Sequence, residues 1–290
     1  MFKIKLKLNK KILKRAVFGV IIIGLLSVYC IYIYSRPDKL EVIFLDVGQG
    51  DAILVKTPYG QTILIDGGPD NRVLRRLGQR LPYYQRQIDF VVISHYHDDH
   101  TVGLVELAKR FRIGQLIYAS DLQSSPAIQE LSKYIGRQRS GTGQPSYISI
   151  ESQAKLPLGP DCTLDLLSPT GLEVKADGNN SLVAKLDCLG RRFLFTGDSG
   201  AAVEKVLLKS GWELKASVLK ASHHGSNSAN SEGFLRAVSP GLLAISVGSD
   251  NKFGHPHPKV LDRAESLGIS VRRTDQEGDL LISIPAKIAN

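Results

Sequence analysis

The sequence predicts an α/β fold preceded by one membrane-spanning helix. Two observations predict it: short β-rich runs alternate with helical stretches from about residue 40 onward, and a 19-residue segment without charge, 16–34, precedes them. The 290 residues suit one large domain of this class. Hydrophobic residues at 43% and charged residues at 22% are ordinary globular values, which excludes a disordered or collagen-like chain.

The N-terminal tail carries the basic excess of the chain. Eight of the 37 Lys and Arg residues and no acidic residue precede residue 38, so the remainder holds 29 bases against 28 acids. The formal charge of +9 therefore reflects the tail and does not indicate a nucleic-acid-binding domain. Segment 16–34 matches the roughly 20 residues that cross a bilayer, and Tyr29, Tyr32 and Tyr34 occupy its far end like an interfacial aromatic belt.

A buried core helix and a cleaved signal peptide are the alternatives to an anchor. Neither fits well, because seven bases precede the apolar run and bulky Tyr and Ile residues end it. Basic residues are retained in the cytoplasm, so we expect the domain to face outward. The expected organisation is a basic cytoplasmic tail (1–15), a transmembrane anchor (16–34), a linker (35–39) and an extracytoplasmic domain (40–287).

The elements of the domain fall into two rounds. In the first, strands are expected over 41–47, 51–57, 61–66 and 89–94, and helices over 71–81 and 101–111. In the second, strands are expected over 162–167, 181–188, 191–197, 217–222, 242–248, 269–273 and 279–284, and helices over 201–210, 234–238 and 259–267. Residues 120–160 are rich in Ser, Gly and Gln, so they are expected to form a surface excursion.

The strongest chemical signal directly follows the predicted strand 89–94. The run His95-Tyr96-His97-Asp98-Asp99-His100 gathers three of the seven histidines and two aspartates between a strand and a helix. Imidazole and carboxylate are the ligands that zinc and related divalent ions prefer. A solvated loop with chance histidines is the alternative, and the clustering argues against it. The run therefore predicts a metal site.

This run fits the pattern HxHxDH, and through it the chain resembles the metallo-β-lactamase fold superfamily. LDVGQGDAILV, LIDGG, HYHDDH, FLFTGD, LKASHHGS and SVGSDNKFGHPHPKVL occur in that order, so residues 40–287 resemble the metallo-β-lactamase domain of ComEC-type DNA-internalisation competence proteins. The resemblance implies a four-layer αββα sandwich. Those proteins also carry a polytopic channel region, about which this chain with its single anchor implies nothing.

The resemblance further implies a divalent metal, one or two zinc ions with manganese as the alternative. Its ligands would be His95 and His97 in a first site, Asp99 and His100 in a second, a bridging Asp198, and His223 or His224 to complete the second site, with His223 favoured. One departure concerns the first site. Where the superfamily commonly supplies another His, this chain has Asn180, a weaker neutral ligand, so we expect weak metal binding there.

Such a site supplies hydroxide at neutral pH and stabilises charge on the attacked group, and we expect Asp99 to orient that hydroxide as well as bind metal. Hydrogen-bond donors near the other strand ends favour a phosphate substrate. These are Ser226, Asn251 and Lys252 as substrate-binding groups and His255 as a catalytic contact. His257, bracketed by prolines, is assigned to a turn.

Three further predictions concern supporting residues. Asp46 and Asp51 flank GQG and either orient the metal histidines or cap a plain turn; both readings stay open. Asp66, in Asp-Gly-Gly, is assigned to a structural turn. Cys162 and Cys188 could pair in an oxidising space, although separate core thiols are favoured.

The leading hypothesis is a membrane-anchored metallohydrolase that cleaves phosphodiesters of DNA taken up during competence, with DNA-uptake machinery as its partner. An esterase acting on phosphorylated envelope polymers and a non-catalytic metal-stabilised binding module are the alternatives. Segment 71–140 holds eleven bases against six acids, and Tyr83 and Tyr84 within it would suit single-strand stacking. Metal analysis combined with a hydrolysis panel discriminates among these hypotheses.

Overall fold

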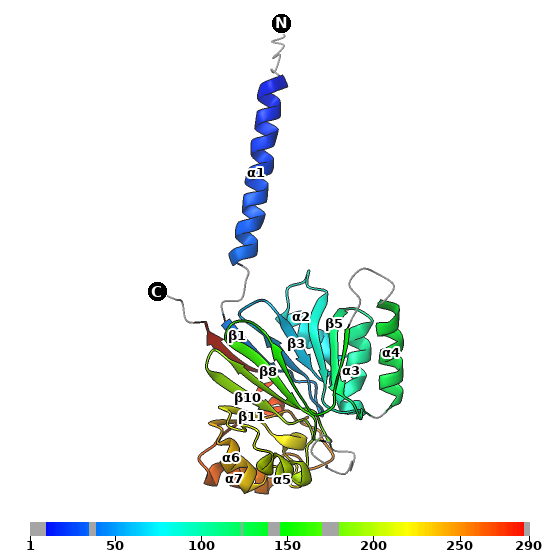
Figure 1. Ribbon diagram of the computed structural model, residues 1–290, viewed down its shortest axis with the longest axis vertical. Helices are drawn as coiled ribbons and strands as arrows, with labels where there is room; N and C mark the ends of the chain where they lie inside the picture. Colours follow the sequence, from blue (N-terminus) through cyan, green and yellow to red (C-terminus); the bar gives the residue numbers. More distant parts are fainter. Residues whose placement is uncertain (1–9, 35–38, 123, 139–145, 170–179, 287–290) are drawn as a thin grey trace.

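Two seven-stranded sheets pack face to face, with helices on both outer sides, in a computed structural model that describes residues 10–34, 39–122, 124–138, 146–169 and 180–286 (Figure 1). The predicted four-layer αββα sandwich is confirmed. Helix α1 (Lys10–Tyr34) stands apart from the sandwich.

The first sheet has the strand order β14-β1-β2-β3-β4-β5-β6. Its strands are β1 (Lys39–Phe44), β2 (Ile53–Lys56), β3 (Thr62–Ile65), β4 (Gln87–Ile93), β5 (Arg112–Ala119), β6 (Ser146–Ile150) and β14 (Leu280–Pro285). Strands β3 to β6 are parallel neighbours, whereas β14, β1, β2 and β3 pair antiparallel. Its outer face packs against α2 (Arg72–Arg80), α3 (Asp98–Ala108) and α4 (Pro126–Gln138).

The second sheet has the order β13-β12-β11-β10-β9-β8-β7. Its strands are β7 (Gln153–Pro157), β8 (Cys162–Leu167), β9 (Val183–Cys188), β10 (Arg191–Phe195), β11 (Val218–Lys220), β12 (Leu242–Ile245) and β13 (Ser270–Arg273). Helices α5 (Ala201–Lys209), α6 (Glu232–Val238) and α7 (Pro258–Ser266) cover its outer face, and the short α8 (Thr274–Glu277) follows β13.

Alternation along the central strands builds the core between the sheets. In β1, Leu40, Val42 and Phe44 join the cluster between the sheets, while Ile43 packs toward the helices. Because both faces of these strands are buried, their sequences are continuous apolar runs. The rigid double sheet fixes where each strand ends, and the loops beyond those ends carry the polar residues.

Two regions differ from the sequence-based prediction. Strand β5 was not predicted, and residues 120–160 are not a plain surface excursion: they supply α4, β6 and β7. Helix α4 buries Ala127, Leu131 and Ile135, one residue per turn, between polar neighbours that weaken the hydrophobic pattern. Strands β6 and β7 lie at sheet edges, where half of each strand faces solvent.

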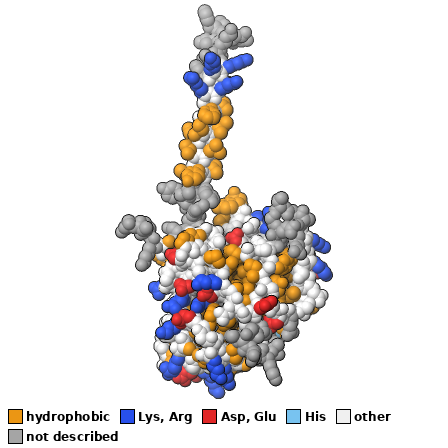
Figure 2. All heavy atoms as spheres, viewed as in Figure 1, with side chains coloured by type: hydrophobic (Ala, Val, Ile, Leu, Met, Phe, Trp, Pro, Cys, Tyr) orange, Lys and Arg blue, Asp and Glu red, His pale blue; other side chains and the backbone are white. Residues whose placement is uncertain are grey.

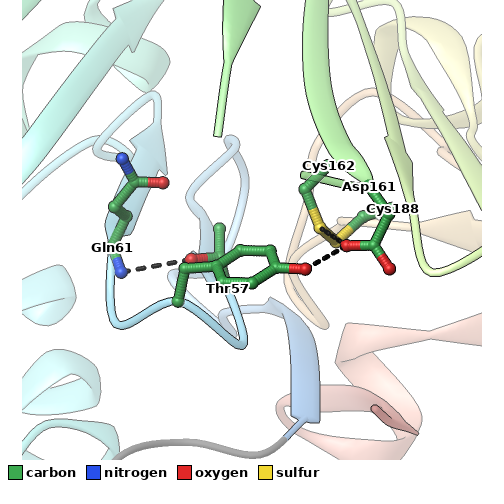
Figure 3. Close-up of a disulfide and its surroundings, with 6 residues drawn as sticks. Thr57, Gln61, Asp161, Cys162 and Cys188 are labelled. Atoms are coloured by element: carbon green, nitrogen blue, oxygen red, sulfur yellow. Dashed lines mark hydrogen bonds between the residues drawn. A yellow bond between two sulfur atoms is a disulfide. The ribbon is translucent and has the colours of Figure 1, made fainter. Parts of the chain in front are cut away.

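Cys162 and Cys188 form a disulfide, contrary to the favoured reading of separate thiols (Figure 3). The two residues are register partners on the antiparallel strands β8 and β9, with Cα atoms 4.0 Å apart. Asp161, next to Cys162, accepts a hydrogen bond from Tyr59 Oη of the β2–β3 turn. The sequence could not bring these cysteines together, because their proximity depends on the strand register.

Helix α1 contains an 18-residue window, Leu13–Cys30, with a mean hydropathy of 1.8 and no buried residue. By length and composition this window is a candidate membrane span. Figure 2 shows basic side chains at its N-terminal end and hydrophobic side chains along it. Residues 1–9 of the predicted tail, residues 35–38 of the predicted linker, and the side chains of Tyr32 and Tyr34 lie outside the described part of the chain.

Candidate metal centre

The candidate metal centre lies where strands of both sheets end. The loop after β4 carries residues 95–100, the loop after β10 carries Asp198, and β11 leads into the 3-10 helix η2 (Ser222–Gly225). The loop after β1 packs against the first of these so closely that a Cβ at Gly50 (φ +141°) would overlap the carbonyl oxygen of Asp99. Carboxyl ends of strands therefore gather the polar residues at one end of the sandwich.

One group of candidate ligands consists of Asp99, His100, Asp198 and His224, each with a ligand atom within 4.8 Å of the others. Asp198 Oδ1 lies 3.4 Å from His100 Nε2 and 3.6 Å from His224 Nε2. Asp99 Oδ2 lies 3.3 Å from His224 Nε2. Two imidazoles and two carboxylates around one point fit a divalent ion such as zinc.

A second group consists of His95, His97 and Asp198 under the same 4.8 Å limit. His95 Nε2 lies 4.0 Å from Asp198 Oδ2, and the His95 and His97 rings lie 4.5 Å apart. Asp198 belongs to both groups, as expected for a carboxylate between two sites. The structure thus brings together six of the seven metal ligands named from the sequence.

Buried nitrogen and oxygen atoms at the centre support a metal there. Among the described residues, the Nε2 atoms of His95, His100 and His224 and Oδ1 of Asp198 are buried and have no hydrogen-bond partner. Unsatisfied buried polar atoms are costly, and a missing ion is one physical explanation for them. Because these atoms converge from four elements, the residues fit a divalent metal.

The two histidines of η2 lie differently relative to the other candidate ligands, and the difference does not match the assignment favoured from the sequence. His224 is 1% exposed and belongs to the four-residue group, whereas His223 is 29% exposed and its Nε2 lies 3.7 Å from Asp198 Oδ2. Both residues have left-handed backbone conformations, with φ of 49° and 54°. The sequence favoured His223; this geometry favours His224.

Two aspartates lie next to the Nδ1 atoms of the ligand candidates His100 and His224. Asp66 Oδ2 lies 2.9 Å from His100 Nδ1, and Ser94 Oγ donates to the same oxygen at 2.6 Å. Asp51 Oδ1 lies 3.5 Å from His224 Nδ1, which also contacts the carbonyl oxygen of Ser246 at 3.0 Å. Contacts at Nδ1 fix the ring so that Nε2 faces the centre. Of the two readings of Asp51, the geometry favours orientation of histidines.

Lys220, at the end of β11, is a buried cation inside this acidic site. Its side chain is 1% exposed, and Nζ lies 2.5 Å from Asp51 Oδ2 and donates to Gly197 O at 3.1 Å. Burial alone would raise the pKa of Asp51, but Lys220 and His224 outweigh it and hold that pKa below its usual range. Lys220 therefore keeps Asp51 ionised behind His224.

Burial and neighbouring charges shift the pKa values of the buried site residues in opposite directions. Burial lowers the pKa of His224, but Asp198 and Asp51 outweigh it and raise that pKa to about 9. Burial raises the pKa of Asp99, but the close contact with His224 and the charge of His100 bring it down to about 2. The metal-free site therefore holds protons on His100 and His224 and charge on Asp99 and Asp198, and metal binding must displace those protons.

His255 lies at the rim, its ring centroid 5.6 Å from that of His223. Burial, together with His224 and His223, lowers the pKa of His255 to about 4, so the ring is neutral at pH 7. Asn251 does not point its amide at a substrate: Nδ2 donates to Gly248 O and His255 O, and Oδ1 accepts from His255 N. Asn251 thus holds the His255 loop in place.

The remaining predicted residues lie farther from the ligand atoms. Ser226 Oγ contacts Ser228 Oγ at 2.9 Å within a turn, and Lys252 is an exposed residue of the loop before His255. His257 caps α7, its Nδ1 accepting from Lys259 N at 3.2 Å, which agrees with the turn assignment.

Asp46 is not beside a metal histidine. Its carboxylate pairs with Arg76 of α2 and accepts from Gly48 N at 3.3 Å, so the structure favours the turn reading for this residue. Asn180 is half-buried and precedes Ser181, whose Oγ lies 3.4 Å from His95 Nδ1 and accepts from Asp198 N at 2.8 Å. Asn180 is therefore the chain neighbour of a residue that contacts His95 and Asp198 of the second group, and Asn179 lies outside the described residues.

Sequence reasoning missed Asp66, Ser181 and Lys220. Asp66 was assigned to a turn, and its φ of +58° does bend the chain, but its carboxylate also contacts His100. Lys220 had one sequence signal, a charge within the predicted strand 217–222. Ser181 gave no signal.

Fold and site together define an αββα metalloprotein of the metallohydrolase class, with candidate ligands in HxHxDH, TGD and SHH segments. The chain belongs to the Metallo-beta-lactamase superfamily, whose family model matches residues 45–248.

Curated relatives include competence proteins. ComE operon protein 3 of Bacillus subtilis (strain 168) is 26% identical over 272 residues, covering 87% of this chain and 34% of that protein. Competence protein ComA of Neisseria gonorrhoeae is 31% identical over 256 residues, covering 86% of this chain and 34% of that protein. The chain spans about a third of the length of these relatives, and they confirm the resemblance to ComEC-type proteins.

Solved structures share the fold at low sequence identity. The metallo-beta-lactamase fold protein YhfI from Bacillus subtilis has a TM-score of 0.56 at 13% identity, covering 84% of this chain and 99% of that one. CmlA, a diiron beta-hydroxylase from Streptomyces venezuelae, has a TM-score of 0.54 at 14% identity, covering 85% and 54%. These likenesses show the fold alone.

Proposed function

We propose that the chain is a membrane-anchored, extracytoplasmic, metal-dependent phosphodiesterase that acts on DNA strands entering the cell during competence. The observation that carries the proposal is the convergence of buried, unsatisfied Nε2 atoms of three histidines on Asp198. Competence proteins among the relatives support DNA as the substrate and DNA-uptake machinery as the partner.

The chain's own residues divide the work. His100, His224, Asp99 and Asp198 would hold one divalent ion, and His95, His97 and Asp198 would hold a weaker second one. When bound, such ions supply a hydroxide nucleophile at neutral pH and stabilise charge on the attacked phosphate. Zinc suits the imidazole-rich first set, with manganese as the alternative.

Other residues would orient the ligand side chains or contact the substrate. Asp66 and Asp51 fix the rings of His100 and His224, and Lys220 holds Asp51 in place. Asp99, partly exposed at 34%, faces the space above the ligands, where it can orient the attacking oxygen. Neutral His255 at the rim can donate a hydrogen bond to a phosphate oxygen.

Two features support the extracytoplasmic location. Lys10, Lys11, Lys14 and Arg15 precede the uncharged segment 16–34 of α1, which favours a cytoplasmic N-terminus. The Cys162–Cys188 disulfide suits an oxidising compartment and would not persist in a reducing cytoplasm.

The test is metal analysis with a hydrolysis panel on the purified full chain. The panel compares single-stranded DNA, duplex DNA, bis(4-nitrophenyl) phosphate and a phosphocholine-bearing polymer, each with the Asp198→Ala variant as control. We expect metal-dependent cleavage of DNA that the variant lacks. Preferred cleavage of the envelope polymer would replace the substrate, and stoichiometric metal without any hydrolysis would mark a binding module.

A further inference from the structure

Two neighbouring tyrosines in the loop between α2 and β4 are exposed without any role at the metal centre. Tyr83 and Tyr84 are 85% and 64% exposed, and their rings meet edge to face with centroids 5.5 Å apart. Large aromatic side chains held in water at one spot usually mark an interaction surface. Their partner can be inferred from where they lie.

The tyrosines lie at the opposite end of the sandwich from the ligands. Strand β4 begins at Gln87, just after them, and ends at Ile93, just before His95. At about 3.3 Å per residue, the strand separates the tyrosines from the metal centre by about 23 Å. This distance excludes stacking of Tyr83 or Tyr84 on a nucleotide that is being cleaved at the metal centre.

The same end of the sandwich holds the start of β1. Glu41 of β1 is the register partner of Lys56, and Lys56 is the register partner of Thr62. Gln85, next to Tyr84, donates from Nε2 to Thr62 Oγ1 at 3.4 Å. The tyrosine loop is therefore level with the first residues of β1 (Figure 1).

The chain length between α1 and β1 ties this end to the membrane. Helix α1 ends at Tyr34 and β1 begins at Lys39, so five residue steps separate them. Five steps span at most about 18 Å, whatever their conformation. If α1 crosses the bilayer, the start of β1 and the loop beside it lie close to the lipid head groups.

Exposed arginines accompany the tyrosines. Arg86 follows them, its carbonyl oxygen accepts from Arg112 N at 2.8 Å, and Arg110 lies two residues before Arg112. All three side chains are exposed, and within the described chain no carboxylate pairs with Arg86 or Arg110. The nearest acid on β1, Glu41, is held by Lys39 and Lys56 at 2.8 and 2.7 Å. Asp89 of β4, which accepts from Thr62 N at 2.8 Å, also lies at this end, so three arginines there outnumber one further carboxylate and the end is net cationic.

We propose that the surface formed by Tyr83, Tyr84, Arg86, Arg110 and Arg112 rests on the anionic phospholipid head groups of the membrane that α1 spans. The inference rests on the anchor in the proposed function. Tyrosine rings favour the membrane interface, and arginines bind lipid phosphate. Figure 2 shows hydrophobic side chains exposed at the end of the domain nearest α1. When the domain rests on the membrane in this way, its metal centre faces away from the bilayer.

The test uses the full chain in proteoliposomes and a tryptophan placed on either end. Tyr84→Trp reports the proposed surface, and Phe253→Trp, at a residue 69% exposed near the metal centre, is the matched control. The unmodified chain, whose sole tryptophan is Trp212, gives the baseline. Lipids brominated in the upper acyl chain quench tryptophan at the interface, and vesicles with and without phosphatidylglycerol test the charge dependence.

We expect quenching of Tyr84→Trp well above the baseline and no added quenching of Phe253→Trp. Replacing each of Arg86, Arg110 and Arg112 by Gln should lower the apparent docking equilibrium about fivefold per residue in anionic vesicles. Carbonate-resistant flotation of the chain, scored separately, tests the anchor. A chain that floats but leaves Tyr84→Trp unquenched overturns the surface alone, whereas failure to float overturns the anchor and the surface with it. A Tyr84→Trp signal changed by single-stranded DNA but not by brominated lipid would overturn the proposal in favour of a nucleic-acid surface.

Discussion

Replacement of Lys220 by methionine is the sharpest test of how the acidic site is held together. Lys220 and Asp51 are 1% and 2% exposed, and their charged atoms lie 2.5 Å apart. Methionine keeps most of the volume of lysine and removes only the ammonium group. The variant therefore leaves the Asp51 carboxylate buried without its closest cation.

The magnitude follows from the cost of breaking a buried pair. Removal of one partner of such a pair lowers the free energy of unfolding by about 3–5 kcal/mol. For a domain of this size each kcal/mol lowers Tm by about 2–4 °C, so we expect a decrease of roughly 6–20 °C. A bound divalent ion brings positive charge to the same carboxylates, so the loss should be smaller in metal than in EDTA.

Urea unfolding of Lys220→Met and the unmodified chain, with EDTA and with zinc, measures this difference. Lys185→Met is the control: Lys185 is also buried, but its Nζ donates to Glu213 O at 2.9 Å and lies 3.7 Å from the partly exposed Asp165. We expect a loss of only about 1 kcal/mol there. Because the folded-state pKa of Asp51 is lowered, its contribution is present above about pH 4 and is lost in acid, where the two proteins should converge. An unchanged unfolding midpoint for Lys220→Met at pH 7 in EDTA would refute the reasoning.

Four further outcomes are expected. Asp198→Ala should remove most bound metal and nearly all turnover, whereas His257→Ala should keep metal near the unmodified level; equal loss in both would mean that the ligand set is misplaced. Asn180→His should tighten the weaker metal site without changing the tighter one, because imidazole binds divalent ions better than a neutral amide; two equally tight sites in the unmodified chain, measured by zinc or manganese titration, would contradict this. The pKa of His224 is raised to about 9 in the metal-free site, so its contribution to stability is full below about pH 6.5 and is lost as the pH rises through 9; urea unfolding in EDTA should show a decrease of up to about 3 kcal/mol that His224→Asn lacks. Protease added to intact spheroplasts should digest the domain, and its protection until the cells are permeabilised would reverse the assigned topology.

Local patterns predicted most of the strands and helices and one compact metal-binding motif, and the family resemblance carried by that motif and its companions implied the sandwich and the ligand set. His95, His97, Asp99 and His100 lie within six residues, so no long-range information was needed to group them. The contact between Asp66 and His100 joins residues 34 positions apart, and it exists only because β3 and β4 are parallel neighbours. A turn reading of Asp66 was therefore the natural one from sequence.

The sequence could not choose between His223 and His224 for a different reason. Adjacent residues in a loop point in directions set by backbone torsions, and both residues adopt left-handed values that non-glycine residues rarely take. Lys220 was overlooked because a lysine at a strand end is usually solvated, and its burial depends on Asp51 from the other sheet. Such pairings across the sandwich are invisible to periodicity.

The disulfide affects how long the protein stays folded but does not position the residues of the candidate metal centre. Cys162 and Cys188 join β8 and β9 at the ends remote from the ligands, and they close a loop with a sequence separation of 26 residues. Closing such a loop in the unfolded chain favours the folded state by about 3.5 kcal/mol. Reduction would thus shorten the survival of the domain while leaving the histidines and aspartates where they are. The redox poise of its surroundings would determine how long the protein lasts rather than how fast it works.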